Sequence, residues 1–162
     1  MIKNILVDLS NFAFSCSLEN SKKKVARYEN IRVLMEFFKS LKKDYQEIIV
    51  VFLADATLKH RIDEREKLLH DIRVGDILEA PASSRADEYL LEFLNQNPDD
   101  TIIVSNDRFQ DYSAPSSTLT KWRFPGMIIC SQFIIPGLVE TFEREPKVTQ
   151  IVKTGMKLEG GT

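Results

Sequence analysis

Short apolar runs that alternate with longer amphipathic stretches constrain the fold of this chain more than any other feature. Four runs are clear and the one at Asp76–Ala80 is weaker; the clear ones are Ile5–Val7, Ile48–Leu53, Thr101–Val104 and Met127–Cys130. Consecutive apolar residues of this kind are typical of strands that are buried on both faces, as they are in parallel sheets. The runs therefore predict a mostly parallel sheet.

The stretches between the runs carry apolar residues at helical spacing. Apolar side chains three and four residues apart predict a helix over Tyr28–Lys43, helical turns between Leu58 and Ile72, and a helix around Tyr89–Leu94 that ends before Pro98. Strands and helices that alternate in this way build an open sheet with helices on both faces. We expect a three-layer α/β/α, Rossmann-like domain with a central, mostly parallel sheet.

The length of 162 residues suits one domain, with a less regular segment at its end. We assign residues 1–140 to the domain and residues 141–162 to a C-terminal tail. The tail contains Val148–Val152, which fits an edge strand, an arm on a partner or a disordered segment.

Cysteine content and hydropathy indicate the compartment. The two cysteines, Cys16 and Cys130, are too few for a disulfide framework or a four-ligand zinc site, so we expect a cytoplasmic protein. The N-terminus does not read as a signal peptide. No apolar run approaches the roughly 20 residues that cross a bilayer, so no membrane partner is expected. The net charge of −2 leaves nucleic acid open, because local patches set the electrostatic footprint.

Acidic residues follow the predicted strands where parallel sheets bind their ligands. Asp8 directly follows the run Ile5–Val7, and Asp55 follows the run that ends at Leu53. Asp107 follows the run that ends at Val104, and Asp87 and Glu88 open the helix after the weaker run Asp76–Ala80. Ligands bind beyond the carboxyl ends of parallel strands, so we expect these carboxylates along one edge. Such a cluster repels itself, and a hard cation such as Mg²⁺ relieves the repulsion. The pattern favours a metal site.

The segment after the fourth strand adds another acid. Asp107 and Asp111 are four residues apart, which predicts that both lie on one face of a short helix.

Each acid also has an ordinary structural explanation. Ser84 and Asp87 have the spacing of a capping box, and Asp107 would complement the dipole of the short helix behind a Ser105 cap. Asp55 is explained by a cap of the turn that follows it. Unrelated caps need not converge on one edge, so the joint pattern favours the metal site, with Asp55 as its weakest member.

Three blocks of the sequence resemble a known family of nucleases. They are Ile5–Asn11, Ser84–Glu88 and Ile103–Tyr112, and the last is the most specific because its Ser-Asn-Asp is followed four residues later by a second Asp. In order and spacing, the chain from Met1 to about Pro136 resembles the NYN branch of the PIN-like ribonucleases, and within it the Regnase-type domain. Two cysteines leave no CCCH zinc finger of the kind that some relatives carry.

The resemblance implies a PIN-like fold and an endoribonuclease that hydrolyses single-stranded RNA with Mg²⁺ or Mn²⁺. It implies that the catalytic and metal-binding acids are Asp8, Asp87, Asp107 and Asp111, with Glu88 as a further metal ligand. Leu9 stands where the first motif of the family usually has glycine, and Glu88 where the family often has a second aspartate.

Candidate RNA contacts surround these acids. Cationic, amide and hydroxyl side chains can donate to phosphate and sugar oxygens, and here they are Ser10, Asn11, Lys59, Arg61, Arg85, Ser105, Asn106 and Arg108. The ordinary alternative for Lys59–Lys67 is a salt-bridged helix surface. Tyr112 and Trp122 are candidates for stacking a base, with packing as the alternative.

Other activities fit the sequence less well. A haloacid-dehalogenase-like phosphatase needs a second Asp two residues after the first, where this chain has Ser10. A response-regulator receiver needs paired acids after the first strand and a late strand-end lysine that this chain does not offer. The remaining alternative is a catalytically weak or inactive PIN-like module that binds RNA or protein. A homodimer, an antitoxin and an RNA-processing partner stay open.

Overall fold

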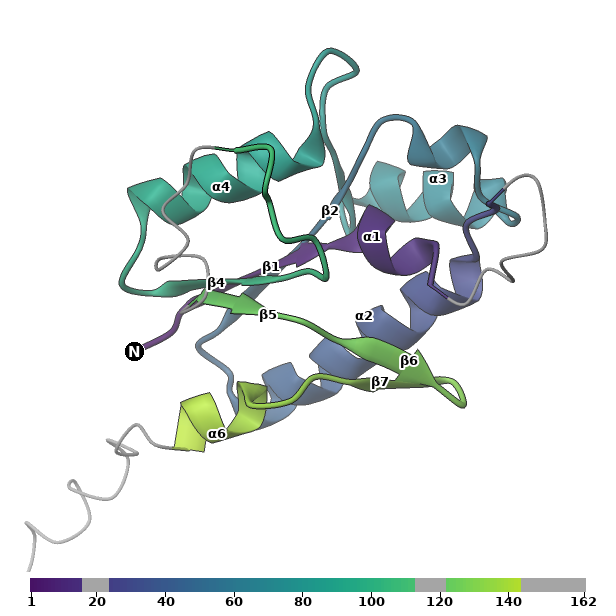
Figure 1. The fold of residues 1–162 in the computed structure, drawn as a ribbon. Coiled ribbons are helices and arrows are strands. Elements are labelled where there is room, and N and C mark those ends of the chain that lie inside the picture. The colour runs from purple at the N-terminus through teal and green to yellow at the C-terminus, as the bar shows by residue number, and fades with distance from the viewer. Residues whose placement is uncertain (16–23, 113–121, 144–162) are drawn as a thin grey trace, which may run out of the picture.

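A sheet of five parallel strands forms the centre of the computed structural model, which describes residues 1–15, 24–112 and 122–143 (Figure 1). The strands lie in the order β3-β2-β1-β4-β5, and every pairing between neighbours is parallel. Their bounds are Asn4–Asp8 for β1, Ile49–Ala54 for β2, Leu78–Glu79 for β3, Thr101–Val104 for β4 and Arg123–Phe124 for β5. The parallel sheet that the apolar runs predicted is confirmed.

Helices cover both faces of this sheet. Helix α4 packs on one face, and the opposite face carries α1, α2 and α3 (Figure 1). The bounds are Leu9–Ala13 for α1, Tyr28–Asp44 for α2, Arg65–Val74 for α3 and Ala86–Gln96 for α4, with a short 3₁₀ turn η1 at Leu58–His60. The three-layer α/β/α arrangement is therefore as predicted.

Alternate residues of β1 divide the core into two parts. Ile5 and Val7 are buried in the larger part, together with α1 and α2, whereas Leu6 is buried in the smaller part beneath α4. This division follows from the period of two in a strand, which sends successive side chains to opposite faces. Because β1 is apolar on both faces, it lies at the centre of the sheet.

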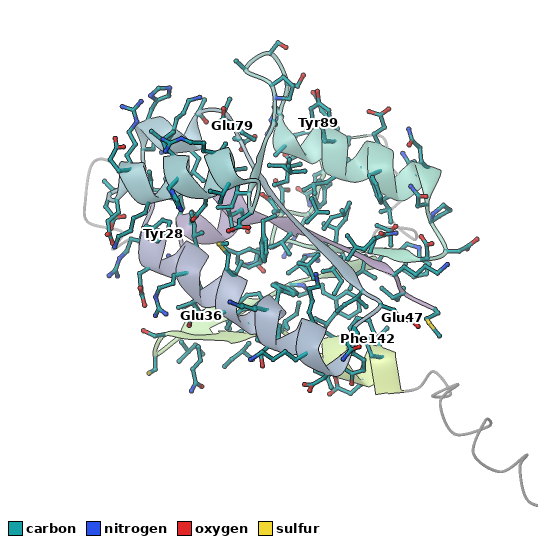
Figure 2. The ribbon with its side chains drawn as sticks, turned by 180° about the vertical axis from the view of Figure 1, so that it is seen from behind. Tyr28, Glu36, Glu47, Glu79, Tyr89 and Phe142 are labelled. Carbon is teal, nitrogen blue, oxygen red and sulfur yellow. The ribbon has the colours of Figure 1, made fainter. Side chains whose placement is uncertain are left out.

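Helix α2 matches its predicted range to within one residue. Leu34 and Phe38 of its apolar stripe are fully buried, while Glu36 lies on the outer surface (Figure 2). The stripe accounts for the helix, since most helical stability in a protein comes from packing an amphipathic face.

The predicted fifth strand is wrong in its position. Met127–Ile129 form β6, which pairs antiparallel with β7, Gln132–Ile134, in a separate two-stranded sheet, and β5 takes the edge of the main sheet instead. Phe133 of β7 packs against Phe12 and Phe37, at ring centroid distances of 5.2 and 5.3 Å. The apolar run misled because Met127 is half exposed and only the alternate side chains of this hairpin face the core.

The last described element is α6, Leu138–Glu143, which closes the larger part of the core. Phe142 packs against Tyr45 beyond the end of α2, with ring centroids 5.0 Å apart (Figure 2). The predicted tail begins within α6, and its candidate strand Val148–Val152 lies outside the described residues. No helix in the described segments is long and apolar enough to cross a membrane.

Candidate active site

The carboxyl ends of β1, β2 and β4 meet the start of α4 at one edge of the sheet. Asp8 is the last residue of β1, Asp55 directly follows β2, Ser105 directly follows β4, and Asp87 is the second residue of α4. The parallel register sets Asp8 level with Leu53 of β2. The predicted gathering of acids at this edge is therefore present for the residues that end strands or begin α4.

Asp8 is the most deeply buried acid of this edge, with 4% of its surface exposed. Its Oδ2 accepts a hydrogen bond of 2.7 Å from the Ser105 hydroxyl, and its Oδ1 accepts one of 3.3 Å from the backbone N–H of Asn11. Burial raises the pKa of Asp8 to about 7; the Ser105 bond opposes this rise, and the charges of Asp87 and Asp55 add to it. The carboxylate is fixed in position and costly to ionise.

Ser105 connects Asp8 to the segment after β4. Its hydroxyl also accepts a hydrogen bond of 3.0 Å from the backbone N–H of Asp107, and its carbonyl accepts one of 3.1 Å from the Arg123 side chain. Ser105 is fully buried. Sequence reasoning offered Ser105 as an RNA contact, and the structure shows its hydroxyl bound to two groups of the protein itself.

Asp55 joins two parts of the site, which the sequence analysis did not foresee. Its backbone N–H donates to the Ser10 hydroxyl at 2.8 Å, and its Oδ1 accepts from the backbone N–H of Ala86 at 2.8 Å. Asp55 thereby links α1 to the first residue of α4, immediately before Asp87. The sequence signal for this role is that Asp55 directly follows the apolar strand β2.

Asp87 lies at the centre of the electrostatic cluster. Partial burial raises its pKa first, and the charges of Asp107, Asp55 and Glu88 raise it further, while Arg85 lowers it. One Asp87 oxygen lies 3.5 Å from the Arg85 guanidinium. The predicted capping box is wrong, because the cap residue of α4 is Arg85, no side chain caps it there, and the Ala86 N–H is bound by Asp55.

The segment after β4 is not the predicted helix. Residues 105–112 form bends and turns, in which Asp107 Oδ1 accepts from the backbone N–H of Phe109 at 2.8 Å. Phe109 has a φ of 51°, a conformation unusual for a bulky residue, and its ring is buried beneath α4. An aspartate that bonds the backbone two residues on favours a turn over a helix.

Asp107 and Asp111 consequently have different surroundings. Asp107 is half-buried and its charge acts on Asp87, whereas Asp111 is exposed. Asp111 helps to raise the pKa of Arg85, after the larger effects of Tyr112 and Asp87. The expected stacking of Asp107 and Asp111 on one helical face does not occur.

Leu9 and Asn11 shape the start of α1. Leu9 is fully buried in the core, so the turn after Asp8 is filled by a side chain where the family pattern has glycine. Asn11 Oδ1 accepts a hydrogen bond of 3.2 Å from the backbone N–H of Asn106. Asn11 therefore ties the end of β1 to the end of β4.

Asn106 holds the β5–β6 turn through both atoms of its side-chain amide. Its Nδ2 donates to the Gly126 carbonyl at 2.8 Å, and its Oδ1 accepts from the Gly126 N–H at 3.0 Å. A Cβ at Gly126 would lie 2.5 Å from the Phe133 ring, so glycine is required at this close approach. Asn106 was predicted as an RNA contact, and its side chain has this structural role.

The predicted cationic contacts divide into paired and stacked residues. Lys59 forms an ion pair of 2.9 Å with Glu79, as the salt-bridged alternative predicted. The guanidinium of Arg61 lies 4.5 Å from the centre of the Phe14 ring, and that of Arg85 lies 5.9 Å from the Tyr112 ring. Two further residues of the predicted interface are the exposed Arg108 and Trp122, which packs partly against both parts of the core.

The donor set suits a hard cation held by few direct protein ligands. Within residues 1–15, 24–112 and 122–143, no three His, Cys, Asp or Glu side chains lie close enough to form a complete metal cage. Mg²⁺ usually takes one or two carboxylates, several waters and substrate phosphate oxygens. Asp8, Asp87 and Asp107 offer oxygen donors of this kind, and a cation beside Asp8 would stabilise its ionised form.

Comparison with known proteins places the chain in a nuclease context. A family model described as the Zc3h12a-like ribonuclease NYN domain matches residues 1–124. A comparison with curated proteins gives no match. Among solved structures, the chain is similar to nuclear proteinaceous RNase P 2 from A. thaliana, with 15% sequence identity and a TM-score of 0.60. The likeness covers 82% of this chain but only 29% of that one, and it shows a shared fold.

Proposed function

The chain belongs to the Zc3h12a-like ribonuclease NYN domain family, and from this premise we propose that it is a metal-dependent endoribonuclease that hydrolyses phosphodiester bonds of single-stranded RNA. The family match confirms the resemblance to the NYN ribonucleases that the sequence blocks indicated. The proposal goes further in naming a divalent cation, the kind of RNA and the residues that act.

The observation that carries the proposal is the state of Asp8. Burial raises the pKa of the Asp8 carboxyl to about 7, so its ionised form is costly. A helix cap alone does not require the ionised form. Asp8 does cap α1 through the Asn11 N–H, and it also lies between the Ser105 hydroxyl donor and the carboxylates of Asp87 and Asp55. Such a group is suited to receive a cation.

We assign the cation to Asp8 and Asp107 as direct ligands, with Asp87, Glu88 and Asp111 acting through water. When bound, Mg²⁺ or Mn²⁺ would acidify a water molecule and neutralise charge on the phosphoryl oxygens. Asp87 and Glu88 lie in the first turn of α4, and Arg85, which neighbours Asp87, can contact phosphate while it stays at the acid edge. Ser105 orients Asp8, and Asp55 fixes the start of α4.

Exposed groups around the acids support single-stranded RNA as the substrate. The planar guanidinium groups of Arg61 and Arg85 lie over aromatic rings, and both surfaces favour unpaired bases. The same proposal places the protein in the cytoplasm, where the exposed free thiol of Cys130 would stay reduced.

Cleavage of labelled RNA tests the proposal. The pure protein is incubated with a single-stranded RNA, its duplex and the matching DNA, in Mg²⁺, in Mn²⁺ or in chelator. We expect internal cleavage of the single strand, loss of cleavage in chelator, and loss in Asp8→Asn. The matched control is Asp44→Asn, which changes an exposed acid at the far end of α2.

Two results would reject the proposal. The first is equal cleavage by the wild type and Asp8→Asn, which would indicate a contaminating nuclease. The second is RNA binding without any cleavage in either metal, which would support the alternative of an inactive RNA-binding module.

A further inference from the structure

A pocket of about 400 Å³ opens beside the acids, between the end of α1 and the residue that follows η1. We propose that it is a subsite for one nucleotide of single-stranded RNA, adjacent to the phosphodiester that is cleaved. We call it the Arg61 pocket, and its lining residues are Asn11, Phe14, Ser15, Lys24, Arg61 and Asn106. The inference rests on the proposed function in taking RNA as the ligand.

The pocket begins next to the most buried acid. Asn11, one of its walls, donates its backbone N–H to Asp8, and Asn106, another wall, directly follows the Ser105 that holds Asp8. A nucleotide in the pocket would therefore have its phosphate close to the acid edge. The volume lies within the range of roughly 300 to 1,000 Å³ that is usual for small-molecule sites.

Charge distinguishes this pocket from the second hollow at the same edge. Among the described residues, the lining of the Arg61 pocket contains the cations Lys24 and Arg61 and no carboxylate. The other hollow, of about 280 Å³, is lined partly by Asp55 together with Arg85. An anionic nucleotide is therefore favoured in the Arg61 pocket, because cations attract phosphate and an acid repels it.

The Arg61 side chain is already oriented for a planar ligand. Its guanidinium lies 4.5 Å from the centre of the Phe14 ring, so both flat groups line one wall. Unpaired bases stack on aromatic rings and on guanidinium planes. A cation held by a ring also loses less conformational freedom when it binds a ligand.

Hydrogen bonds fix the walls of the pocket in place. The buried Asn30 donates its side-chain amide to the carbonyls of Ala13 and Ser15 at 3.2 and 2.8 Å, which holds the end of α1. The backbone N–H of Ala26 donates to the Arg61 carbonyl at 2.8 Å. The walls at Ser15 and Arg61 are thus held by hydrogen bonds, which reduces the reorganisation that these walls need on binding.

Asn11 supplies a polar donor to the same wall. Its side-chain oxygen is engaged by the backbone N–H of Asn106. The remaining group of that amide, Nδ2, can only donate. It suits a phosphate, a sugar oxygen or a base carbonyl in the pocket.

Binding measured in chelator tests the subsite without any catalysis. Fluorescence anisotropy of a labelled single-stranded oligonucleotide is recorded for the wild type, Arg61→Gln, Arg61→Lys, Lys24→Gln and the control Lys42→Gln, which changes an exposed cation near the opposite end of α2. We expect Arg61→Gln to weaken binding by about tenfold, as the loss of a stacked base contact implies. Lys42→Gln should bind as the wild type does.

Salt dependence separates the contribution of charge from that of stacking. Each lost phosphate contact should lower the slope of log affinity against log salt by about 0.7 for a single strand. Arg61→Gln and Lys24→Gln should both show this decrease. Arg61→Lys should keep the slope of the wild type and still lose affinity, because lysine retains the positive charge but lacks the planar guanidinium group.

The outcomes for the subsite and for the proposed function are distinguishable. Wild-type affinity and slope in Arg61→Gln and Lys24→Gln, or an equal loss in Lys42→Gln, would reject the subsite, whatever the wild type cleaves. Loss of binding in the pocket variants alone would support the subsite, whether or not RNA is cleaved. If the wild type cleaves no RNA, the nuclease proposal is rejected and the subsite still stands. Thermal unfolding of each variant confirms that the fold is retained.

Discussion

Two groups of site residues are held in place by different means. The strand-end group, Asp8 and Ser105, is buried at the ends of β1 and β4, whose pairing fixes both residues. The loop group, Asp107 and Asp111, follows β4 in a segment without a helix and depends on a few local hydrogen bonds. The pairing of strands in the sheet therefore sets the positions of the strand-end group. The positions of the loop group depend instead on the bonds of single side chains.

Asp8→Asn should have the largest effect on this comparison. If the strand-end group is the rigid centre of the site, loss of this carboxylate should lower RNA cleavage by about a hundredfold to ten-thousandfold, the range for a positioned catalytic group. Initial rates under saturating Mg²⁺ measure it, with Asp44→Asn as the control. A cleavage rate within a few-fold of the wild-type rate would show that Asp8 is not central to catalysis.

The pH dependence of stability should show the cost of burying Asp8. The pKa of Asp8 is near 3.8 in the unfolded chain and about 7 in the folded one, so the folded state binds more protons between these values. The stabilising contribution is present below pH 4 and is lost as the pH rises through 7. The loss amounts to at most about 4 kcal/mol in the metal-free protein.

Urea unfolding in chelator at pH 5 and pH 8 measures this loss. The wild type should become less stable than Asp8→Asn as the pH rises, because the variant has no carboxyl to ionise at that position. A difference between the two proteins that stays constant with pH would contradict the raised pKa of Asp8.

Ser105→Ala should have the next largest effect, since it acts on both groups. The change removes the donor to Asp8 and the acceptor for the Asp107 N–H. We expect a loss of about ten- to a hundredfold in activity, as is usual for groups that orient metal ligands. The acid limb of the pH–rate profile should move to higher pH, because Ser105 lowers the pKa of Asp8. An unchanged acid limb of the pH–rate profile would show that Ser105 has only a structural role.

Asp111→Asn should have the smallest effect among the acids. Its carboxylate is exposed, and a charge of this kind usually contributes no more than about 1 kcal/mol, or roughly fivefold in rate. Asp107→Asn should lose more, because Asp107 acts on Asp87 and binds the Phe109 N–H. Equal rates for Asp8→Asn and Asp111→Asn would show that the loop group is as central as the strand-end group.

The sequence indicated where the strand-end group lies, although not the bond from Ser105 to Asp8, because the signals of a strand end are local and periodic. An uninterrupted apolar run that ends in a polar residue marks a buried strand and its carboxyl end, as at Val7–Asp8 and Val104–Ser105. Parallel pairing then brings such ends together without further information. The order of the layers followed from the same alternation.

The loop group could not be placed in this way. A spacing of four between Asp107 and Asp111 indicates a shared face only if the segment is helical, and Asp107 instead bonds its own backbone two residues on. The positive φ of Phe109 is maintained by the burial of its ring beneath α4, which is a tertiary contact. The same limit applies to Asp55, whose role depends on Ala86, 31 residues away.

The end of the sheet was also misjudged for a physical reason. Strand β5 has only two residues, one of them the cation Arg123, so it carries no apolar run. Its place is set by pairing with β4 and by the hydrogen bond from Arg123 to Ser105. The more apolar Met127–Ile129 had the stronger strand signal and belongs to the hairpin.

The two-point bond between Asn106 and Gly126 makes one backbone amide a reporter of the whole edge. The Gly126 hydrogen can exchange with solvent only when this bond opens, and opening separates the segment after β4 from the hairpin. Its exchange rate therefore measures the free energy of that separation in the native protein. A cation or an RNA strand that orders the acid edge would slow the exchange of Gly126 without touching it, so the amide can be followed by NMR as ligand is added.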